Sequence, residues 1–156
     1  MKTEFSVRKA RGDDSLHIVD LLAIYARKSL LLPRTMEDIS SRIDNFIVAQ
    51  GGDEKIIGCC ALRDYGNGLY EIRSLAVHGD FMNRGIGSEL IRFSMEKIPA
   101  EGSLTKVFAL TYRSELFIRL GFRKVQKEMF PEKIWADCSI CKKKDNCDEE
   151  AVLIEL

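Results

Sequence analysis

Residues 70–91 constrain the fold of this chain more than any other stretch, because they predict a strand, a glycine turn and a helix in direct succession. The apolar content of the strand comes from Ile72 and residues 75–77, and the helical pattern continues to Ile98. Between them lies the sequence Asn83-Arg84-Gly85-Ile86-Gly87-Ser88. The first N–H groups of a helix have no internal partner, and the helix dipole makes that end positive. The segment therefore predicts a site for a phosphate or pyrophosphate group of a nucleotide cofactor.

The remaining pattern predicts a mixed α/β sheet with helices on both faces. Apolar residues fall at helical spacing from Leu16 to Leu30, and Pro33 ends that run. A second short helix is expected to begin at Thr35, with Asp38 three residues on as a variant of a capping box. Besides the 70–77 strand, strands are expected over residues 5–8, 46–50, 55–63, 106–110, 122–127 and 151–156.

Length and charge restrict the kind of protein. A chain of 156 residues predicts one domain, residues 1–156, and 46% of the residues are hydrophobic. The 24 basic and 24 acidic side chains balance, so we expect no nucleic-acid partner. No apolar run reaches the roughly 18–20 residues of a membrane span, and no signal-peptide pattern is present. We therefore expect a cytoplasmic protein whose five cysteines are thiols or metal ligands.

The glycine turn alone is a weak signal, because it lacks the dinucleotide Gly-x-Gly-x-x-Gly spacing and the Lys-Ser/Thr of a P-loop. The simpler reading is an ordinary glycine turn before an amphipathic helix. Three further features favour a cofactor site: an acidic residue, Glu71, on the preceding strand, a second strand at 106–110, and a short helix from Ser114 ending in Gly121-Phe122. In this order the chain resembles the GNAT-type N-acetyltransferase superfamily, which uses acetyl-coenzyme A. The resemblance covers nearly the whole chain and implies a mixed, mostly antiparallel twisted sheet.

The resemblance assigns cofactor residues to two stretches. The pantetheine arm of acetyl-CoA would run beside the backbone of Leu75, Ala76 and Val77. The pyrophosphate would bind the turn formed by Asn83, Arg84, Gly85, Ile86, Gly87 and Ser88. The family usually has Gln or Arg three residues before the first glycine, where this chain has Met82. Backbone N–H contacts to phosphate do not need that side chain.

The chemistry of acetyl transfer requires a proton acceptor, because an amine is mostly protonated at pH 7. The resemblance makes Glu71 this base; the alternative is an exposed strand glutamate in an ion pair with Arg73. The acid that protonates the departing thiolate is usually a Tyr four residues before the Gly of Gly-Phe, and here that residue is Phe117. Tyr112 is near in sequence but does not match the motif, so the source of this proton stays open.

Three patches, residues 31–35, 57–63 and 70–77, resemble the acetyltransferase domain of N-acetylglutamate synthases, in the short stand-alone bacterial form. This implies an amino-acid acceptor, most specifically L-glutamate, and a role in arginine biosynthesis. Arg34, Arg63 and Cys59 fall in the patches assigned to the amino-acid pocket, and arginine recognises carboxylates bidentately. The alternative is that both arginines are exposed surface residues. Cys59 and Cys60 alternate on a strand, so one of the two is expected to face the core.

Other functions stay open at this stage. The same fold acts on other small amines and on protein N-termini, and a non-catalytic acyl-CoA-binding or metal-binding regulatory module is a third reading. A homodimer is compatible with the resemblance.

A cysteine-bearing loop is expected at about residues 129–150. Cys138, Cys141 and Cys147 form a C-x2-C-x5-C pattern, and cysteines at x2 spacing are typical zinc ligands. A structural zinc site usually has four ligands, so a fourth would be needed. The candidates are Asp137, Asp148, His78, His17 or water. The alternative is three loop thiols that bind no metal.

Overall fold

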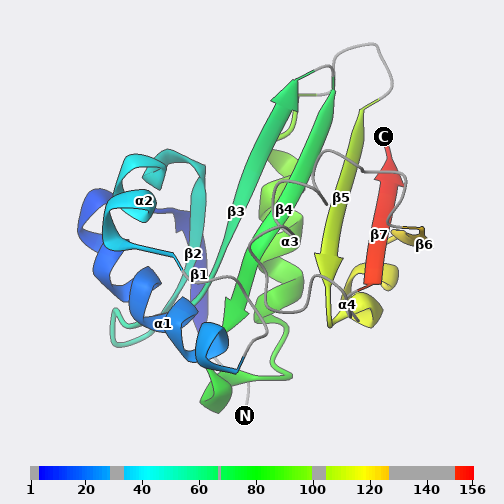
Figure 1. Ribbon diagram of the computed structural model, residues 1–156. Coiled ribbons are helices and arrows are strands. Elements are labelled where there is room, and N and C mark those ends of the chain that lie inside the picture. Colours follow the sequence, from blue (N-terminus) through cyan, green and yellow to red (C-terminus); the bar gives the residue numbers. More distant parts are fainter. Residues whose placement is uncertain (1–3, 29–33, 67, 100–104, 127–149) are drawn as a thin grey trace.

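One mixed sheet organises the molecule (Figure 1). The structure, a computed structural model, describes residues 4–28, 34–66, 68–99, 105–126 and 150–156. Within these ranges the strands are β1 (Phe5–Lys9), β2 (Phe46–Gly51), β3 (Ile56–Gly66), β4 (Leu69–Val77), β5 (Lys106–Thr111), β6 (Arg123–Val125) and β7 (Glu150–Glu155). The helices are α1 (Ser15–Arg27), α2 (Met36–Ser41), α3 (Ile86–Glu96) and α4 (Ser114–Ile118). Short 3-10 turns cover Gly12–Asp14, Ile43–Asn45 and Gly79–Phe81.

The strand order is β1-β2-β3-β4-β5-β7-β6, and each described pair is antiparallel except β4 and β5. These two strands run parallel and pair over only three positions, from Leu69 opposite Lys106 to Glu71 opposite Phe108. Beyond that point the strands diverge, toward the bottom of Figure 1. The predicted mixed, mostly antiparallel sheet is therefore confirmed, and it opens beside the second half of β4.

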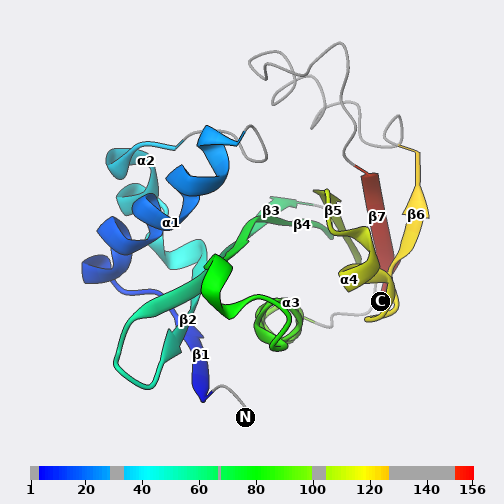
Figure 2. The ribbon, with the colours of Figure 1, turned by 90° about the horizontal axis from the view of Figure 1, so that it is seen from below.

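Helices cover both faces of the sheet, as expected (Figure 2). On one face α3 buries Ile86, Leu90 and Ile91 in one apolar cluster. On the other face α1 and α2 build a second cluster, which includes Ile18 and Ile39. Burial of these apolar side chains is the main driving force that holds the layers together.

Cys59 and Cys60 are both fully buried on β3 and belong to different clusters. One of the two was expected to face the core, and in the structure both do, because helices cover both sides of the strand. No helix in the described ranges is both long and apolar enough to cross a bilayer.

The starts of α1 and α2 differ in how their first N–H groups are satisfied. Thr35 caps α2, since its hydroxyl oxygen accepts a hydrogen bond of 3.0 Å from the N–H of Asp38. This is one half of the predicted capping box; the carboxylate of Asp38 pairs with Arg34 and Arg42. Asp14 precedes α1 but makes no side-chain cap. Its carboxylate instead accepts hydrogen bonds from the Arg8 guanidinium, 2.8 and 3.0 Å, and from the N–H of Arg11, 2.7 Å. A charged partner thus takes the carboxylate that could have capped the helix.

Candidate active site

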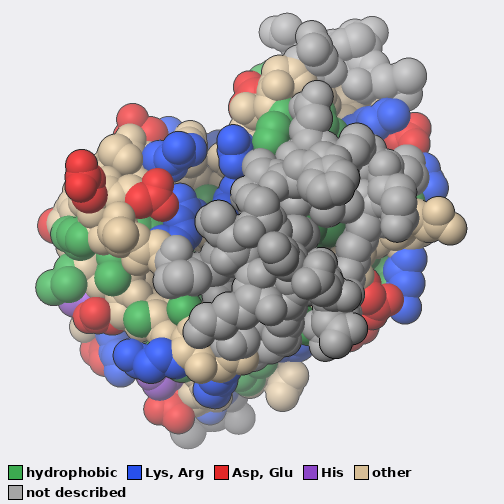
Figure 3. All heavy atoms as spheres, in the orientation of Figure 1, with side chains coloured by type: hydrophobic (Ala, Val, Ile, Leu, Met, Phe, Trp, Pro, Cys, Tyr) green, Lys and Arg blue, Asp and Glu red, His purple; other side chains and the backbone are tan. Residues whose placement is uncertain are grey.

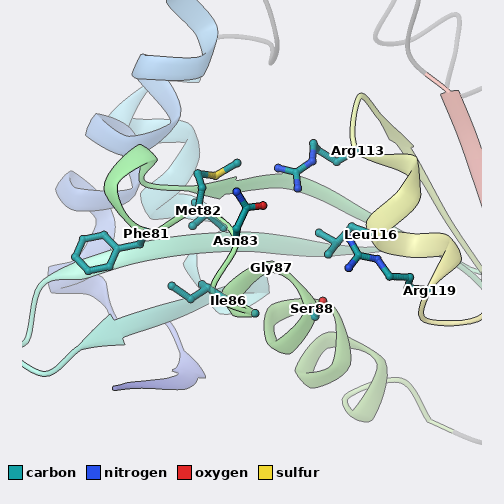
Figure 4. A pocket seen from close by; sticks show the side chains of 11 residues that line it. Phe81, Met82, Asn83, Ile86, Gly87, Ser88, Arg113, Leu116 and Arg119 are labelled. Carbon is teal, nitrogen blue, oxygen red and sulfur yellow. The ribbon is translucent and has the colours of Figure 1, made fainter. Parts of the chain in front are cut away.

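A pocket of about 180 Å³ opens at the N-terminal end of α3, between the end of β4 and α4 (Figure 4). Most of the residues predicted to bind the cofactor phosphates line it. They are Asn83, Gly85, Ile86, Gly87 and Ser88, together with Val77 from the strand. The glycine turn is therefore the floor of a concave site and not only the start of a helix.

The two glycines of the turn have different tasks. Gly85 is the N-cap of α3 and has a φ of 83°, in the left-handed region that favours glycine. The first described helical hydrogen bond runs from the N–H of Glu89 to the carbonyl of Gly85, and no side chain caps this end. At Gly87 a Cβ atom would lie only 2.8 Å from Cδ2 of Leu116, so this glycine allows α4 to approach α3 closely. The result is an uncapped helix end that faces a pocket, an arrangement suited to an anion.

The other predicted cofactor residues lie outside the pocket walls. Arg84 places its guanidinium over the Phe81 ring, 5.4 Å from the ring centroid. Leu75 and Ala76 lie on β4 beside an irregularity in its pairing with β3, where Ser74 has a φ of 55°. The side chain of Ala76 is buried in the α1–α2 cluster, and that of Leu75 packs against the cluster around α3. At these two positions the backbone is therefore the part of the residue that remains for a ligand.

Sequence reasoning missed the opposite wall of the pocket. Arg113 and Arg119, before and after the short helix α4, line it together with Leu116 (Figure 4). No motif marks these arginines, because only the packing of α4 against the start of α3 brings them to the glycine turn. Tyr25 was also missed, because only the packing of α1 against β4 brings it to the pocket. Its hydroxyl donates a hydrogen bond to the carbonyl of Val77, at the edge of the same pocket.

A second cluster of polar groups surrounds Glu71 on the face that carries α1 and α2. Glu71 is only 2% exposed, so the alternative of an exposed strand glutamate is wrong. The Tyr65 hydroxyl donates a 2.9 Å hydrogen bond to Oε1 of Glu71, and Nη1 of Arg73 lies 3.6 Å from the same atom. The expected pairing with Arg73 is thus present, but inside the protein. Burial, together with the negative charge and hydrogen bond of Glu71, raises the pKa of Tyr65 to about 12, so its hydroxyl stays a donor at neutral pH.

The two arginines predicted to bind substrate flank this cluster. Arg63 lies opposite Glu71 in the β3–β4 register, and its guanidinium stacks over the Tyr65 ring at 4.5 Å. Arg34 precedes α2; its Nε contacts the Asp38 carboxylate at 2.6 Å and its Nη1 donates to the Ser74 hydroxyl at 3.0 Å. The Arg34 side chain is 11% exposed, so for this residue the surface alternative is wrong. Basic and acidic side chains gather together beside α2 on this face (Figure 3).

Cys59, predicted to bind substrate, and Phe117, at the position of the family's usual acid, both have their side chains in the core. The thiol of Cys59 is fully buried and lies 3.6 Å from the carbonyl oxygen of Ser74, and burial raises its pKa. Such a thiol supports the wall behind Ser74 and stays protonated. Phe117, at the position of the usual acid Tyr, is buried edge-to-face against Phe122.

The cysteine loop at about 129–150 lies outside the described residues except for Glu150, and so do Cys138, Cys141 and Cys147. The zinc site therefore stays a prediction. Within the described ranges no group of three His, Cys, Asp or Glu residues is arranged to hold a metal ion.

Comparison with known proteins identifies the family. Residues 42–124 match the model of the acetyltransferase (GNAT) domain. An uncharacterized N-acetyltransferase of Chlorobaculum tepidum, CT2212, is 42% identical over 147 residues, which are 94% of this chain and 94% of that protein. An amino-acid acetyltransferase of Mycobacterium tuberculosis is 33% identical over 122 residues, which are 77% of this chain and 69% of that protein.

Solved structures agree. Rv2747 from Mycobacterium tuberculosis, in complex with CoA, has a TM-score of 0.81 and 28% identity, covering 97% of this chain and 99% of that one. N-acetylglutamate synthase from Neisseria gonorrhoeae, complexed with coenzyme A and N-acetyl-glutamate, has a TM-score of 0.82 and 25% identity. That match covers 100% of this chain and 36% of the synthase chain. The chain belongs to the GNAT family of acetyltransferases.

Proposed function

We propose that this acetyltransferase moves an acetyl group from acetyl-CoA to the α-amino group of an amino acid, with L-glutamate as the preferred acceptor. One observation carries the proposal: a single strand, β4, connects the two candidate sites. Glu71 and its arginines lie near the start of β4, and Val77 at its end lines the pocket below α3. A cofactor that lies along this strand with its phosphates in the pocket would bring its thioester toward Glu71.

The backbone supports this placement of the cofactor. After Glu71 and Phe108 the β4–β5 ladder ends, so the following part of this edge of β4 has no ladder partner on β5. Backbone groups there are suited to hydrogen-bond the amides of a pantetheine arm. The uncapped end of α3 is suited to the pyrophosphate. Two of the similar solved structures hold CoA, which supports the same cofactor for this chain.

The proposed reaction assigns one proton acceptor. The acceptor amine is an ammonium ion near neutral pH and attacks only after it loses a proton. Glu71 takes this proton, directly or through one water, while Tyr65 and Arg73 hold the carboxylate in place. The amine nitrogen then forms a bond to the thioester carbonyl carbon and the C–S bond breaks. The nitrogen gives up its second proton, the departing CoA thiolate takes up one proton, and the proton held by Glu71 is released to solvent.

Arginine side chains near Glu71 favour an acidic acceptor. In the part of the chain that the structure describes, Arg63 contacts an aromatic ring and no carboxylate, so no described acidic side chain competes with a ligand for its guanidinium. Arg34 donates hydrogen bonds from Nε to Asp38 and from Nη1 to Ser74, and these two contacts fix the direction of its guanidinium. The similarity to an amino-acid acetyltransferase and to a synthase that holds N-acetyl-glutamate supports the choice of glutamate and a role in arginine biosynthesis.

A substrate screen with detection of the released CoA thiol tests the proposal. Glutamate should exceed glutamine by about ten- to a hundredfold in kcat/KM, because one charge-assisted hydrogen bond is lost. Arg63→Gln should narrow this gap, and Arg11→Gln, which changes an exposed arginine away from the cluster, should not. The glutamate assignment is wrong if glutamine, aspartate or a simple amine is the better substrate of the wild type.

A further inference from the structure

Both walls of the α3 pocket carry positive charge. One wall is the uncapped N-terminal end of α3, where backbone N–H groups and the helix dipole point into the pocket. The other wall carries the guanidinium side chains of Arg113 and Arg119 (Figure 4). Positive groups on two sides of one small cavity repel each other unless an anion lies between them. The second wall therefore adds two side-chain charges to the partial positive charge of the helix end.

Glu115 contacts the arginine wall from outside the pocket. Its Oε1 accepts a 2.7 Å hydrogen bond from Nε of Arg113, while Nε of Arg119 is 3.4 Å from its backbone carbonyl. The hydrogen bond from Arg113 is the main cause that lowers the pKa of Glu115, so this carboxylate is charged at neutral pH. Glu115 is 56% exposed, and it is not a pocket-lining residue. Such an exposed pair is weak and easily exchanged for another partner.

We propose that Arg113 and Arg119 bind a phosphate group of the nucleotide cofactor from the side opposite the glycine turn, and that Glu115 competes with this phosphate for Arg113. The inference rests on the proposed cofactor, acetyl-CoA. A phosphate presents several charged oxygens to a planar guanidinium and carries at least the charge of a carboxylate. The phosphate therefore replaces Glu115 on Arg113 when the cofactor enters, and Glu115 returns when the product CoA leaves.

Two phosphate sources on CoA share this chemistry, the pyrophosphate and the ribose 3′-phosphate. Calorimetry of Arg113→Gln and Arg119→Gln with CoA and with 3′-dephospho-CoA distinguishes them. Each variant should bind CoA about tenfold or more weakly than the wild type, because a charge-assisted contact is lost. A loss for CoA alone identifies the 3′-phosphate, and an equal loss for both ligands identifies the pyrophosphate.

The matched control is Arg92→Gln, which removes an exposed arginine paired with Glu89 on α3. Its CoA affinity should equal that of the wild type. The inference is overturned if the wild type binds CoA and neither Arg113→Gln nor Arg119→Gln weakens that binding. If the wild type itself does not bind CoA, the proposed function has failed instead.

A double-mutant cycle tests the competition. Glu115→Gln should raise CoA affinity by about two- to fivefold, the scale of an exposed ion pair. In the Arg113→Gln background the same change should have no effect, because the contested guanidinium is gone. An equal gain in both backgrounds would show a general charge effect and would exclude competition for Arg113. Thermal melts of all variants confirm that the fold is retained.

Discussion

At the scale of single residues, the most informative side chain is Glu71. A carboxylate that is 2% exposed costs free energy unless it is paired and hydrogen-bonded. Here the Tyr65 hydroxyl and the Arg73 guanidinium supply the partners. Buried charged groups with specific partners concentrate at functional sites. These surroundings support the proposed role of Glu71 as the proton acceptor.

Tyr65→Phe tests the positioning of Glu71. The variant keeps the ring that stacks with Arg63 and packs near Phe108, and it removes only the hydroxyl. We expect kcat to fall by about tenfold, because a hydrogen bond to a charged group is lost, while CoA affinity stays the same. The control is Tyr70→Phe, which removes a hydroxyl from the residue that directly precedes Glu71 on β4. This variant should keep the wild-type kcat. Wild-type turnover in Tyr65→Phe would show that Glu71 needs no such support.

At the scale of elements, the junction between β1 and α1 contains one partly buried ion pair. Asp14 joins the Arg8 side chain on β1 to the backbone of Arg11 at the start of the helical segment. Burial raises the pKa of Asp14, but the hydrogen bonds from Arg8 and Arg11 outweigh it, so the pKa lies below its usual value. The pair is therefore a source of stability that depends on pH.

Asp14→Asn should be less stable than the wild type by about 1–3 kcal/mol at pH 7, because it leaves Arg8 without its charged partner. A lowered pKa in the folded state gives stability that is complete above the unfolded value, about 4, and is lost as pH falls through the folded value. The difference between the two proteins should therefore shrink in urea unfolding at pH 3. Asp13→Asn, at an 80% exposed position, should change stability by less than about 0.5 kcal/mol. Equal losses in both variants would contradict this account.

Local sequence patterns predicted most elements, and failed where distant segments meet. Alternation and turn residues located the described strands within a few residues, and Thr35 was recognised as a helix cap. Asp14 has the residue type of a helix cap but does not cap α1, and the sequence does not reveal that Arg8 is folded against it. The glycine turn was recognised from the sequence because its pattern lies within six consecutive residues, 83–88. Arg113 and Tyr65 were not, because their positions depend on α4 packing and on the β3–β4 register.

At the scale of the whole molecule, cofactor binding should stabilise the fold. At a CoA concentration about 100 times Kd the gain is about 2.7 kcal/mol, which corresponds to roughly 5–10 °C in Tm for a domain of this size. Ser88→Glu should abolish this shift, because it adds a negative charge to the phosphate pocket while favouring the start of α3.

Ser88→Gln, of nearly the same size but neutral, is the control and should keep a clear shift. Ser88 is a better probe than Gly87, where any side chain would press on Leu116. A full CoA shift in Ser88→Glu would place the cofactor elsewhere.

The short parallel seam between β4 and β5 has a consequence for how the active protein is assembled. Strands β2, β3 and β4 follow one another as hairpins, whereas β5 pairs with β7 on the other side of the seam. Hairpins form from contacts close in sequence, and pairing across α3 must wait for a longer loop to close. Glu71 and Phe108 form the last pair of that seam, so the surroundings of the carboxylate are complete only when the two groups of strands have joined. During refolding, the return of turnover therefore marks this joining step, whereas the return of strand content does not.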